Sequence, residues 1–99
     1  MHLESHFQRQ FLNRVKELFP HCIVLKNDPN YMQGVPDFVV FFGPHYAMLE
    51  FKRYQSAARQ ANQQYYIDLF RGWSYAAFVH PSNAEEVLDE LQRTFGTRR

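Results

Sequence analysis

Residues 37–52 read Asp-Phe-Val-Val-Phe-Phe-Gly-Pro-His-Tyr-Ala-Met-Leu-Glu-Phe-Lys, and this stretch predicts a β-hairpin at the centre of the fold. After its first residue, the segment 37–42 is apolar on both alternating faces, which is typical of a strand that is covered on both sides. A Gly-Pro turn connects it to 46–52, a second strand of buried character in which only Glu50 and Lys52 are charged. Charged residues are rarely buried, so packing does not explain why Glu50 and Lys52 occur in a strand of buried character.

The hairpin is expected to bring Asp37, Glu50 and Lys52 to one face of the sheet. A two-residue turn at Gly43 and Pro44 places Asp37 opposite Glu50, whereas a four-residue loop pairs Asp37 with Lys52. Because side chains alternate strictly along a strand, both registers leave the three side chains on the same face. Directly opposed residues have Cβ atoms about 4.5–5.5 Å apart, so the two carboxylates can share one ion.

Two carboxylates this close in an apolar setting repel each other and are costly to desolvate unless a cation lies between them. Mg²⁺ typically uses one or two carboxylates and completes its coordination with water and phosphate oxygens. Lys52 adds a positive charge that can hold an attacking water or stabilise the charge of a pentacovalent phosphate. The pattern predicts metal-dependent phosphodiester hydrolysis. The alternative is an ion pair between Glu50 and Lys52 on an exposed edge strand, with Asp37 merely starting its strand.

Outside the hairpin, the apolar spacing predicts three helices and two further strands. An amphipathic helix is expected over Leu3–Phe19, followed by a short strand at 22–25. A second helix is expected to run from a Ser56 cap to Arg71, followed by a strand over 73–80 and a last helix that begins near 81–83. This order predicts an α/β fold with a mixed central sheet flanked by helices.

The composition favours one domain over residues 1–99 in a reducing, cytoplasmic setting. The length leaves no room for a second core, and 45% hydrophobic with 17% aromatic residues supply a packed interior. Cys22 is the only cysteine, so it can form neither an intrachain disulfide nor a CxxC metal site. No apolar run approaches a membrane span and the N-terminus is unlike a signal peptide, so no membrane partner is expected. A net charge of +1 argues against a general nucleic-acid coat protein.

Val35-Pro36-Asp37 followed by Glu50-Phe51-Lys52 resembles the motif of the PD-(D/E)XK nuclease superfamily, and the element order is similar to its restriction-endonuclease-like α-β-β-β-α-β core. Together with Gly34 and a glutamine on the next helix, these residues are most similar to the small VRR-NUC group, which is common in phages and as a domain of DNA-repair nucleases. The resemblance covers almost the whole chain. It implies an Mg²⁺-dependent DNA endonuclease in which Mn²⁺ can substitute. Asp37, Glu50 and the backbone carbonyl of Phe51 would bind the metal, and Lys52 would act with it in cleavage.

The resemblance also implies an acid on the first helix and a glutamine some ten residues beyond the lysine. Glu4 fits better than Glu17, because it lies on the apolar side of the helix whereas Glu17 points away from it. Glu4 would help to hold the metal directly or through water, although acids in a first helical turn are also favoured by the helix dipole. Gln63 has the expected spacing and would orient the lysine, the water or a phosphate, while Gln60 and Gln64 remain alternatives.

Three basic residues are candidates for contact with DNA phosphates, and each is equally explained as a solvated surface charge: Lys26, Arg53 and Arg59. The resemblance implies a homodimer that cuts branched DNA, Holliday junctions included, and exposed aromatics such as Trp73 would suit a dimer seam. Tyr31 could stack on a base or cover the core. The competing prediction is a non-catalytic DNA-binding or assembly module on a nuclease-like scaffold. A sequence-specific restriction-like enzyme is disfavoured, because the chain has no additional domain to read bases.

Overall fold

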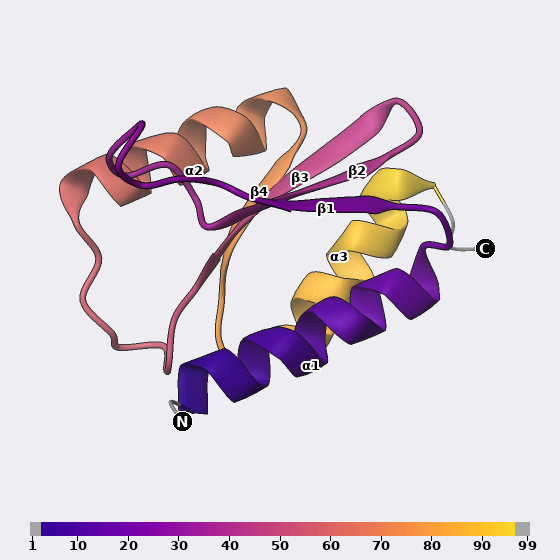
Figure 1. Cartoon of the computed structure of the whole chain (residues 1–99), viewed down its shortest axis with the longest axis horizontal. Coiled ribbons are helices and arrows are strands. Elements are labelled where there is room, and N and C mark those ends of the chain that lie inside the picture. Colours follow the sequence, from indigo (N-terminus) through magenta and orange to yellow (C-terminus); the bar gives the residue numbers. More distant parts are fainter. Residues whose placement is uncertain (1–2, 97–99) are drawn as a thin grey trace.

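A four-stranded sheet lies between two helical layers in the computed structural model, which describes residues 3–96, with side chains from residue 5 onward (Figure 1). The predicted α/β class with a mixed sheet flanked by helices is confirmed. None of the described helices is long and apolar enough to cross a membrane. In chain order, the elements are α1 (Leu3–Leu18), β1 (Ile23–Lys26), β2 (Phe38–Phe42), β3 (His45–Phe51), α2 (Ala61–Trp73), β4 (Tyr75–Val79) and α3 (Ala84–Phe95).

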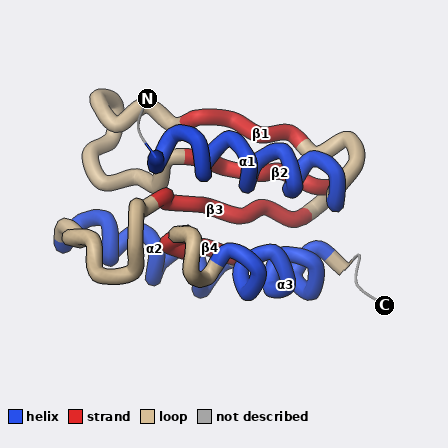
Figure 2. Tube along the Cα trace, turned by 90° about the horizontal axis from the view of Figure 1, so that it is seen from below, coloured by secondary structure: helices blue, strands red, loops and turns tan. Residues whose placement is uncertain are grey.

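The strands lie in the order β1-β2-β3-β4. The pairs β1–β2 and β2–β3 are antiparallel, and β3–β4 is parallel. A parallel pair needs a crossover connection, and α2 provides it as predicted. Figure 2 shows α1 and α3 in front of the strands and α2 behind them.

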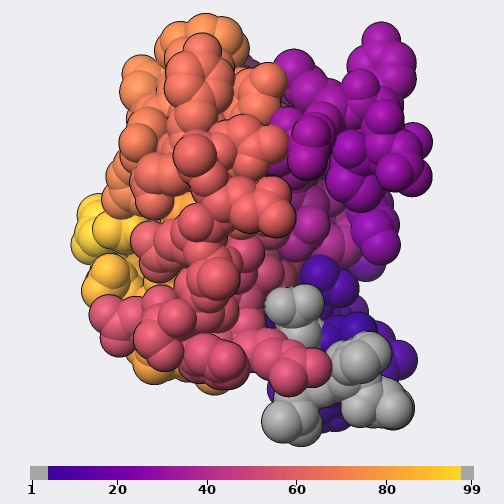
Figure 3. Space-filling view, turned by 90° about the vertical axis from the view of Figure 1, so that its left-hand side faces the viewer, coloured from indigo at the N-terminus to yellow at the C-terminus, as the bar shows by residue number. Residues whose placement is uncertain are grey.

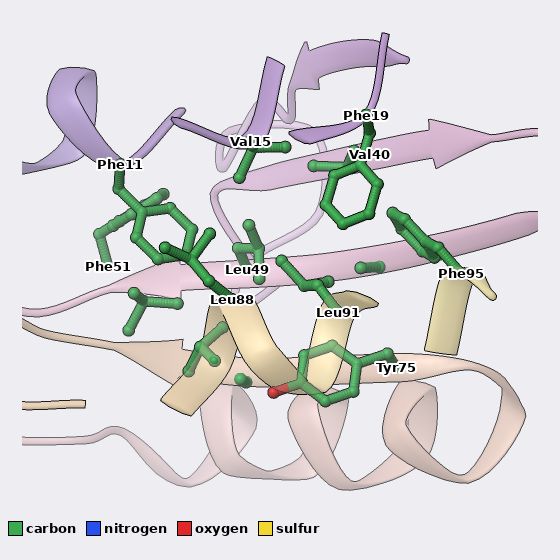
Figure 4. Close-up of a cluster of buried hydrophobic side chains, with 14 residues drawn as sticks. Phe11, Val15, Phe19, Val40, Leu49, Phe51, Tyr75, Leu88, Leu91 and Phe95 are labelled. Atoms are coloured by element: carbon green, nitrogen blue, oxygen red, sulfur yellow. The ribbon is translucent and has the colours of Figure 1, made fainter. Parts of the chain in front are cut away.

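The main core lies between the sheet and the α1–α3 layer. Phe11 of α1, Leu49 of β3 and Phe95 of α3 are all at most 4% exposed and belong to this core (Figure 4). Alternation along β3 sends every second side chain into it, so the intervening side chains point toward α2. A smaller cluster lies under α2 and is formed by Ile67, Ala76 and Phe78, with Met48 and Phe70 packed against it.

Helix α2 covers only part of its side of the sheet. A helix with side chains is about 10–12 Å across and neighbouring strands are about 4.8 Å apart, so one helix covers roughly two strands. α2 contacts β3 and β4, and on β1 and β2 Ile23, Leu25 and Phe41 stay 55%, 50% and 42% exposed. The prediction that 37–42 is covered on both sides is therefore wrong at Phe41.

Part of the outer edge of β4 is bonded by side chains of residues that precede or follow the strand. Arg71 Nη1 donates to the Ala76 carbonyl at 2.7 Å, and Asn83 Nδ2 donates to the Phe78 carbonyl at 2.9 Å. Asn83 Oδ1 accepts the His80 backbone N–H at 2.9 Å. Edge groups that are already bonded do not offer a template to another strand. The other edge strand of the sheet is β1.

The second helix begins later than predicted. It starts at Ala61 with Gln60 as its N-cap, and residues 53–60 form a loop, so the prediction of a Ser56 cap is wrong. Two contacts explain the delay: Lys52 Nζ donates to the Ala58 carbonyl at 3.1 Å, and the Gln60 N–H donates to Gln63 Oε1 at 3.2 Å. These contacts outweigh the helix propensity of the Ala- and Gln-rich stretch.

The same helix also ends later than predicted. Trp73 is its last residue rather than the first of a strand, and β4 begins at Tyr75. The Ser74 N–H donates to the Phe70 carbonyl at 2.8 Å and completes the final turn.

The loop of residues 27–36 is fixed to the start of β2 and to α2. The Asn27 N–H donates to the Asp37 carbonyl and its Nδ2 to the Pro36 carbonyl, both at 2.8 Å. Gly34 has a φ of +89°, and a Cβ added there would lie 2.6 Å from Asn62 Cγ. The loop backbone therefore packs directly on α2.

Replacing Gly34 by Ala is expected to lower the free energy of unfolding by more than the same change at Gly43. Both residues have positive φ, which costs a non-glycine residue roughly 1–2 kcal/mol, but an added Cβ meets nothing within 4 Å at Gly43. Urea denaturation of Gly34→Ala and Gly43→Ala measures the difference. Equal losses would contradict close packing between the loop and Asn62.

Candidate active site

Asp37 and Glu50 lie opposite each other at one end of the β2–β3 hairpin. Phe42 pairs with His45 at the turn, so the two-residue register is the one adopted. Extending it by one residue before the start of β2 sets Asp37 across from Glu50. The Asp37 N–H donates to Glu50 Oε1 at 3.1 Å, and the Phe51 N–H donates to Asp37 Oδ2 at 3.1 Å. Each carboxylate is thus anchored to the backbone of the opposite strand.

The carboxylate of Glu50 is buried inside the sheet. Leu49 and Phe51 point into the α1–α3 core, so Glu50 points to the α2 side and is only 6% exposed. Lys52 Nζ lies 3.9 Å from Glu50 Oε2, with side-chain exposures of 13% and 7%. The ion pair exists, but β3 lies between β2 and β4. The alternative of a pair on an exposed edge strand is therefore wrong.

Gln63 bridges the acid and the lysine from the first turn of α2. Its Nε2 donates to Glu50 Oε2 at 3.2 Å, and its Oε1 accepts from Lys52 Nζ at 3.0 Å. The same Oε1 caps the helix by accepting the Gln60 N–H. Gln64 instead donates to Asp68 on the helix surface at 2.9 Å. Of the three glutamines considered, the structure brings the Gln63 side chain to the carboxylate and the lysine.

Phe78 makes cation–π contacts with two basic side chains at the edge of the site. It was not among the residues predicted from the sequence. It pairs with Glu50 in the β3–β4 register. Lys52 Nζ lies 5.9 Å from its ring centroid, and the Arg59 guanidinium carbon lies 4.1 Å from it. A cation within about 6 Å of an aromatic face is attracted by the ring quadrupole. Because Phe78 meets these residues only through strand pairing and the 53–60 loop, no local sequence signal identifies it.

The other predicted residues lie around the same end of the molecule. Lys26 ends β1 and Arg53 follows β3, and both are exposed. Glu4 lies in the first turn of α1, but its side chain is outside the described residues. The start of α1 is held beside the end of β3, because the Phe7 ring centroid is 6.1 Å from that of Phe51.

His80 follows β4 and lies in the turn into α3. It is 5% exposed, and Ser82 Oγ lies 2.7 Å from its Nδ1. Burial lowers the pKa of His80, the charge of Arg59 lowers it further, and Glu86 opposes the shift. The imidazole is therefore neutral at pH 7.

The donor set suits a hard divalent cation. Asp37 and Glu50 supply carboxylate oxygens, and the Phe51 carbonyl lies on the same side of its strand as the N–H that donates to Asp37. Among the described residues, no group of three or more His, Cys, Asp or Glu side chains could hold a metal. With Lys52, the two acids carry a formal charge of −1, so an added cation reduces their repulsion. Two carboxylates with a carbonyl leave room for water and phosphate, which matches Mg²⁺ or Mn²⁺.

Replacing Gln63 by Ala is expected to lower the free energy of unfolding, because Glu50 and Lys52 each lose a hydrogen-bond partner in a part-buried setting. A loss of about 1–3 kcal/mol is expected for such an unsatisfied group. Gln64→Ala is the matched control and should change stability by less than about 0.5 kcal/mol. Chemical denaturation measures the free energy of unfolding of both variants. Equal free energies of unfolding for Gln63→Ala and Gln64→Ala would contradict the bridging role of Gln63.

Comparisons with family models, curated proteins and solved structures find no match for this chain. A functional assignment must therefore come from the residues that the fold brings together. These are two carboxylates, a lysine and a glutamine on three adjoining elements.

Proposed function

We propose that this chain is a metal-dependent DNA endonuclease of the PD-(D/E)XK type, with Asp37, Glu50 and Lys52 as its catalytic centre. The observation that carries the proposal is the buried Glu50 carboxylate, placed across from Asp37 and 3.9 Å from Lys52 in an interior strand. Burial of these charges is costly, and packing alone gives no reason for it. The order helix, three strands, helix, strand, helix also agrees with the restriction-endonuclease-like core of that superfamily.

The proposed roles follow from what each group can reach. Asp37, Glu50 and the Phe51 carbonyl would hold the ion, which when bound would polarise a phosphoryl oxygen and lower the pKa of water. Lys52 presents an ammonium group to the attacking water and to the charge that develops on phosphorus. Gln63 and the Ala58 carbonyl fix that ammonium group in place. Water would attack the phosphorus in line and pass its proton to solvent. The bond between phosphorus and the 3′ oxygen would break and that oxygen would take a proton from solvent, so that the phosphate stays on the 5′ end, as the resemblance to PD-(D/E)XK nucleases implies.

The face around the site suits the sugar–phosphate backbone of DNA. In Figure 3 the 27–36 loop and α2 lie side by side on this face, with the 53–60 loop and the start of α1 below them. Arg53 and Arg59 belong to the 53–60 loop and Lys26 borders the 27–36 loop, and all three are exposed. We assign them to phosphate contacts, which position a strand without reading its sequence.

A second copy of the chain is proposed to cover the apolar face that α2 leaves open. Ile23, Leu25 and Phe41 lie next to each other across β1 and β2, and each is at least 42% exposed. Apolar patches of this kind mark interaction surfaces. Two carbonyls on the outer edge of β4 are bonded by side chains, and β1 is the other edge strand of the sheet. Two copies that meet there would offer two sites, one for each strand at a branch point such as a Holliday junction.

Asp37→Ala and Lys52→Ala are each expected to lower the Mg²⁺-dependent cleavage rate on the order of 10³-fold or more, because each removes a group that stabilises the transition state. Asp68→Ala and Lys16→Ala remove exposed residues of the same types and should cleave like the wild type. The assay uses linear, flapped, splayed and four-way DNA with Mg²⁺, Mn²⁺ or chelator, and circular dichroism checks the fold.

Full activity in a folded Asp37→Ala protein would reject this catalytic centre. The alternative, a non-catalytic DNA-binding or assembly module, predicts that the wild type binds DNA without divalent metal and never nicks it. The substrate panel also tests the preference for branched DNA, because equal rates on linear and four-way substrates would contradict that preference.

Leu25→Lys is expected to halve the mass measured by light scattering, because it places a charge in the proposed contact between copies. Tyr65→Lys, on the exposed face of α2, should leave the mass unchanged, since Tyr65 is also 59% exposed but lies outside the patch. A wild-type chain that is monomeric at the concentration of the cleavage assay would contradict the dimer.

A further inference from the structure

The loop between β1 and β2 holds an open cavity of about 380 Å³, one lining residue of which, Asn27, is hydrogen-bonded to the backbone of Asp37. The Tyr31 side chain on its wall is 91% exposed and Met32 is 41% exposed, so Tyr31 does not cover the core. The Asn27 N–H donates to the Asp37 carbonyl, so the wall of the cavity is hydrogen-bonded to the residue that precedes β2. The lining consists of Asn27, Asp28, Tyr31, Met32 and Val35.

The Tyr31 ring projects from a loop whose backbone conformation is stabilised by hydrogen bonds. The Asp28 carbonyl accepts the Tyr31 N–H at 3.1 Å and the Met32 N–H at 3.4 Å. The Val35 N–H donates to the Met32 carbonyl at 3.3 Å, and Asp28 Oδ1 accepts the Asn30 N–H at 2.9 Å. A rigid surface loses less entropy when a ligand binds, so this loop is preorganised for contact.

The chemistry of the lining selects an uncharged, flat ligand. No lining residue is a cation, and Asp28 contributes a carboxylate, so a phosphate would be repelled. Tyr31, Met32 and Val35 offer an aromatic ring and apolar surface, on which a nucleobase can stack through its π-face. Lys26 directly precedes the loop and is exposed, but it pairs with Phe38 and therefore starts from the opposite face of the sheet, so it does not line the cavity.

We propose that this cavity holds one unpaired nucleobase, stacked on Tyr31, from the strand whose phosphate lies at Asp37 and Glu50. The inference rests on the proposed nuclease function and specifies its substrate. A base inside an intact duplex is paired and stacked, and it must leave the stack before it can enter a protein pocket. The enzyme therefore prefers DNA with an unpaired nucleotide beside the cleaved bond, as single strands, flaps and splayed arms have, over a fully paired four-way junction.

Binding is measured by fluorescence anisotropy with a labelled single-stranded oligonucleotide and with its duplex, in Ca²⁺. Tyr31→Ala is expected to weaken single-strand binding on the order of 10-fold, which is typical for the loss of one stacked base. Tyr31→Phe keeps the ring and should bind like the wild type. Trp73→Ala removes an aromatic that is 67% exposed at the other end of α2 and should change nothing.

A scan with one abasic nucleotide at each position supplies the second readout. The wild type should show one position where removal of the base weakens binding, and Tyr31→Ala should be insensitive at that position. Equal binding by Tyr31→Ala and wild type would overturn the proposal. It would also be overturned if Tyr31→Ala lost as much affinity for the duplex as for the single strand, or if Tyr31→Phe lost as much affinity as Tyr31→Ala. Absence of DNA binding by the wild type would overturn it as well.

Failure of the cavity and failure of the nuclease can be told apart. Tyr31-dependent binding at one base position, with no nicking in Mg²⁺ or Mn²⁺, would keep the base site and reject the catalysis. Asp37-dependent cleavage with unchanged binding by Tyr31→Ala would keep the nuclease and reject the base site.

Discussion

Burial of the Glu50 carboxylate is the constraint on which the site depends. A carboxylate that is 6% exposed in an interior strand loses most of its hydration, and only bonds from the protein can replace it. Asp37 provides a backbone N–H from one side, and Gln63 and Lys52 provide polar groups from the other. These partners come from three different elements, so the position of the carboxylate requires the complete hairpin and the start of α2 to be in place.

The two faces of the sheet differ in polarity, and the helices cover them to different extents. One face is mostly apolar and is closed by α1 and α3. Phe11 of α1 packs on Phe51 at the end of β3, whereas Phe95 of α3 packs at the turn between β2 and β3. The other face carries the polar site at one end and an apolar surface at the other. A single helix covers β3 and β4 there, which buries Glu50 but leaves the Asp37 end open to the 27–36 and 53–60 loops. The same geometry creates the site and exposes Ile23, Leu25 and Phe41.

Strand alternation made the sequence informative about the hairpin, because Asp37, Glu50 and Lys52 share a face in either register. The helix periods and element order were also readable, since apolar spacing reports which face is buried. The start of α2 could not be predicted from the sequence, because a contact between Lys52 and the Ala58 carbonyl decides it. The role of Phe78 and the packing of Gly34 on Asn62 were hidden for the same reason: both depend on residues far apart in sequence. The spacing implied by the family resemblance favoured Gln63, but helical periodicity left Gln60 and Gln64 as alternatives. The contacts of the three side chains separate them.

The central claim is that the buried Glu50 carboxylate and the partly buried Asp37 carboxylate hold a divalent cation used in phosphodiester cleavage. Mn²⁺ binding, followed by electron paramagnetic resonance, tests it most directly without depending on the choice of DNA substrate. The wild type should show saturable binding at one class of site per chain, and Glu50→Gln, which keeps the side-chain shape, should lose that binding while it stays folded. Equal Mn²⁺ binding by the two proteins, or none by the wild type, would contradict the account.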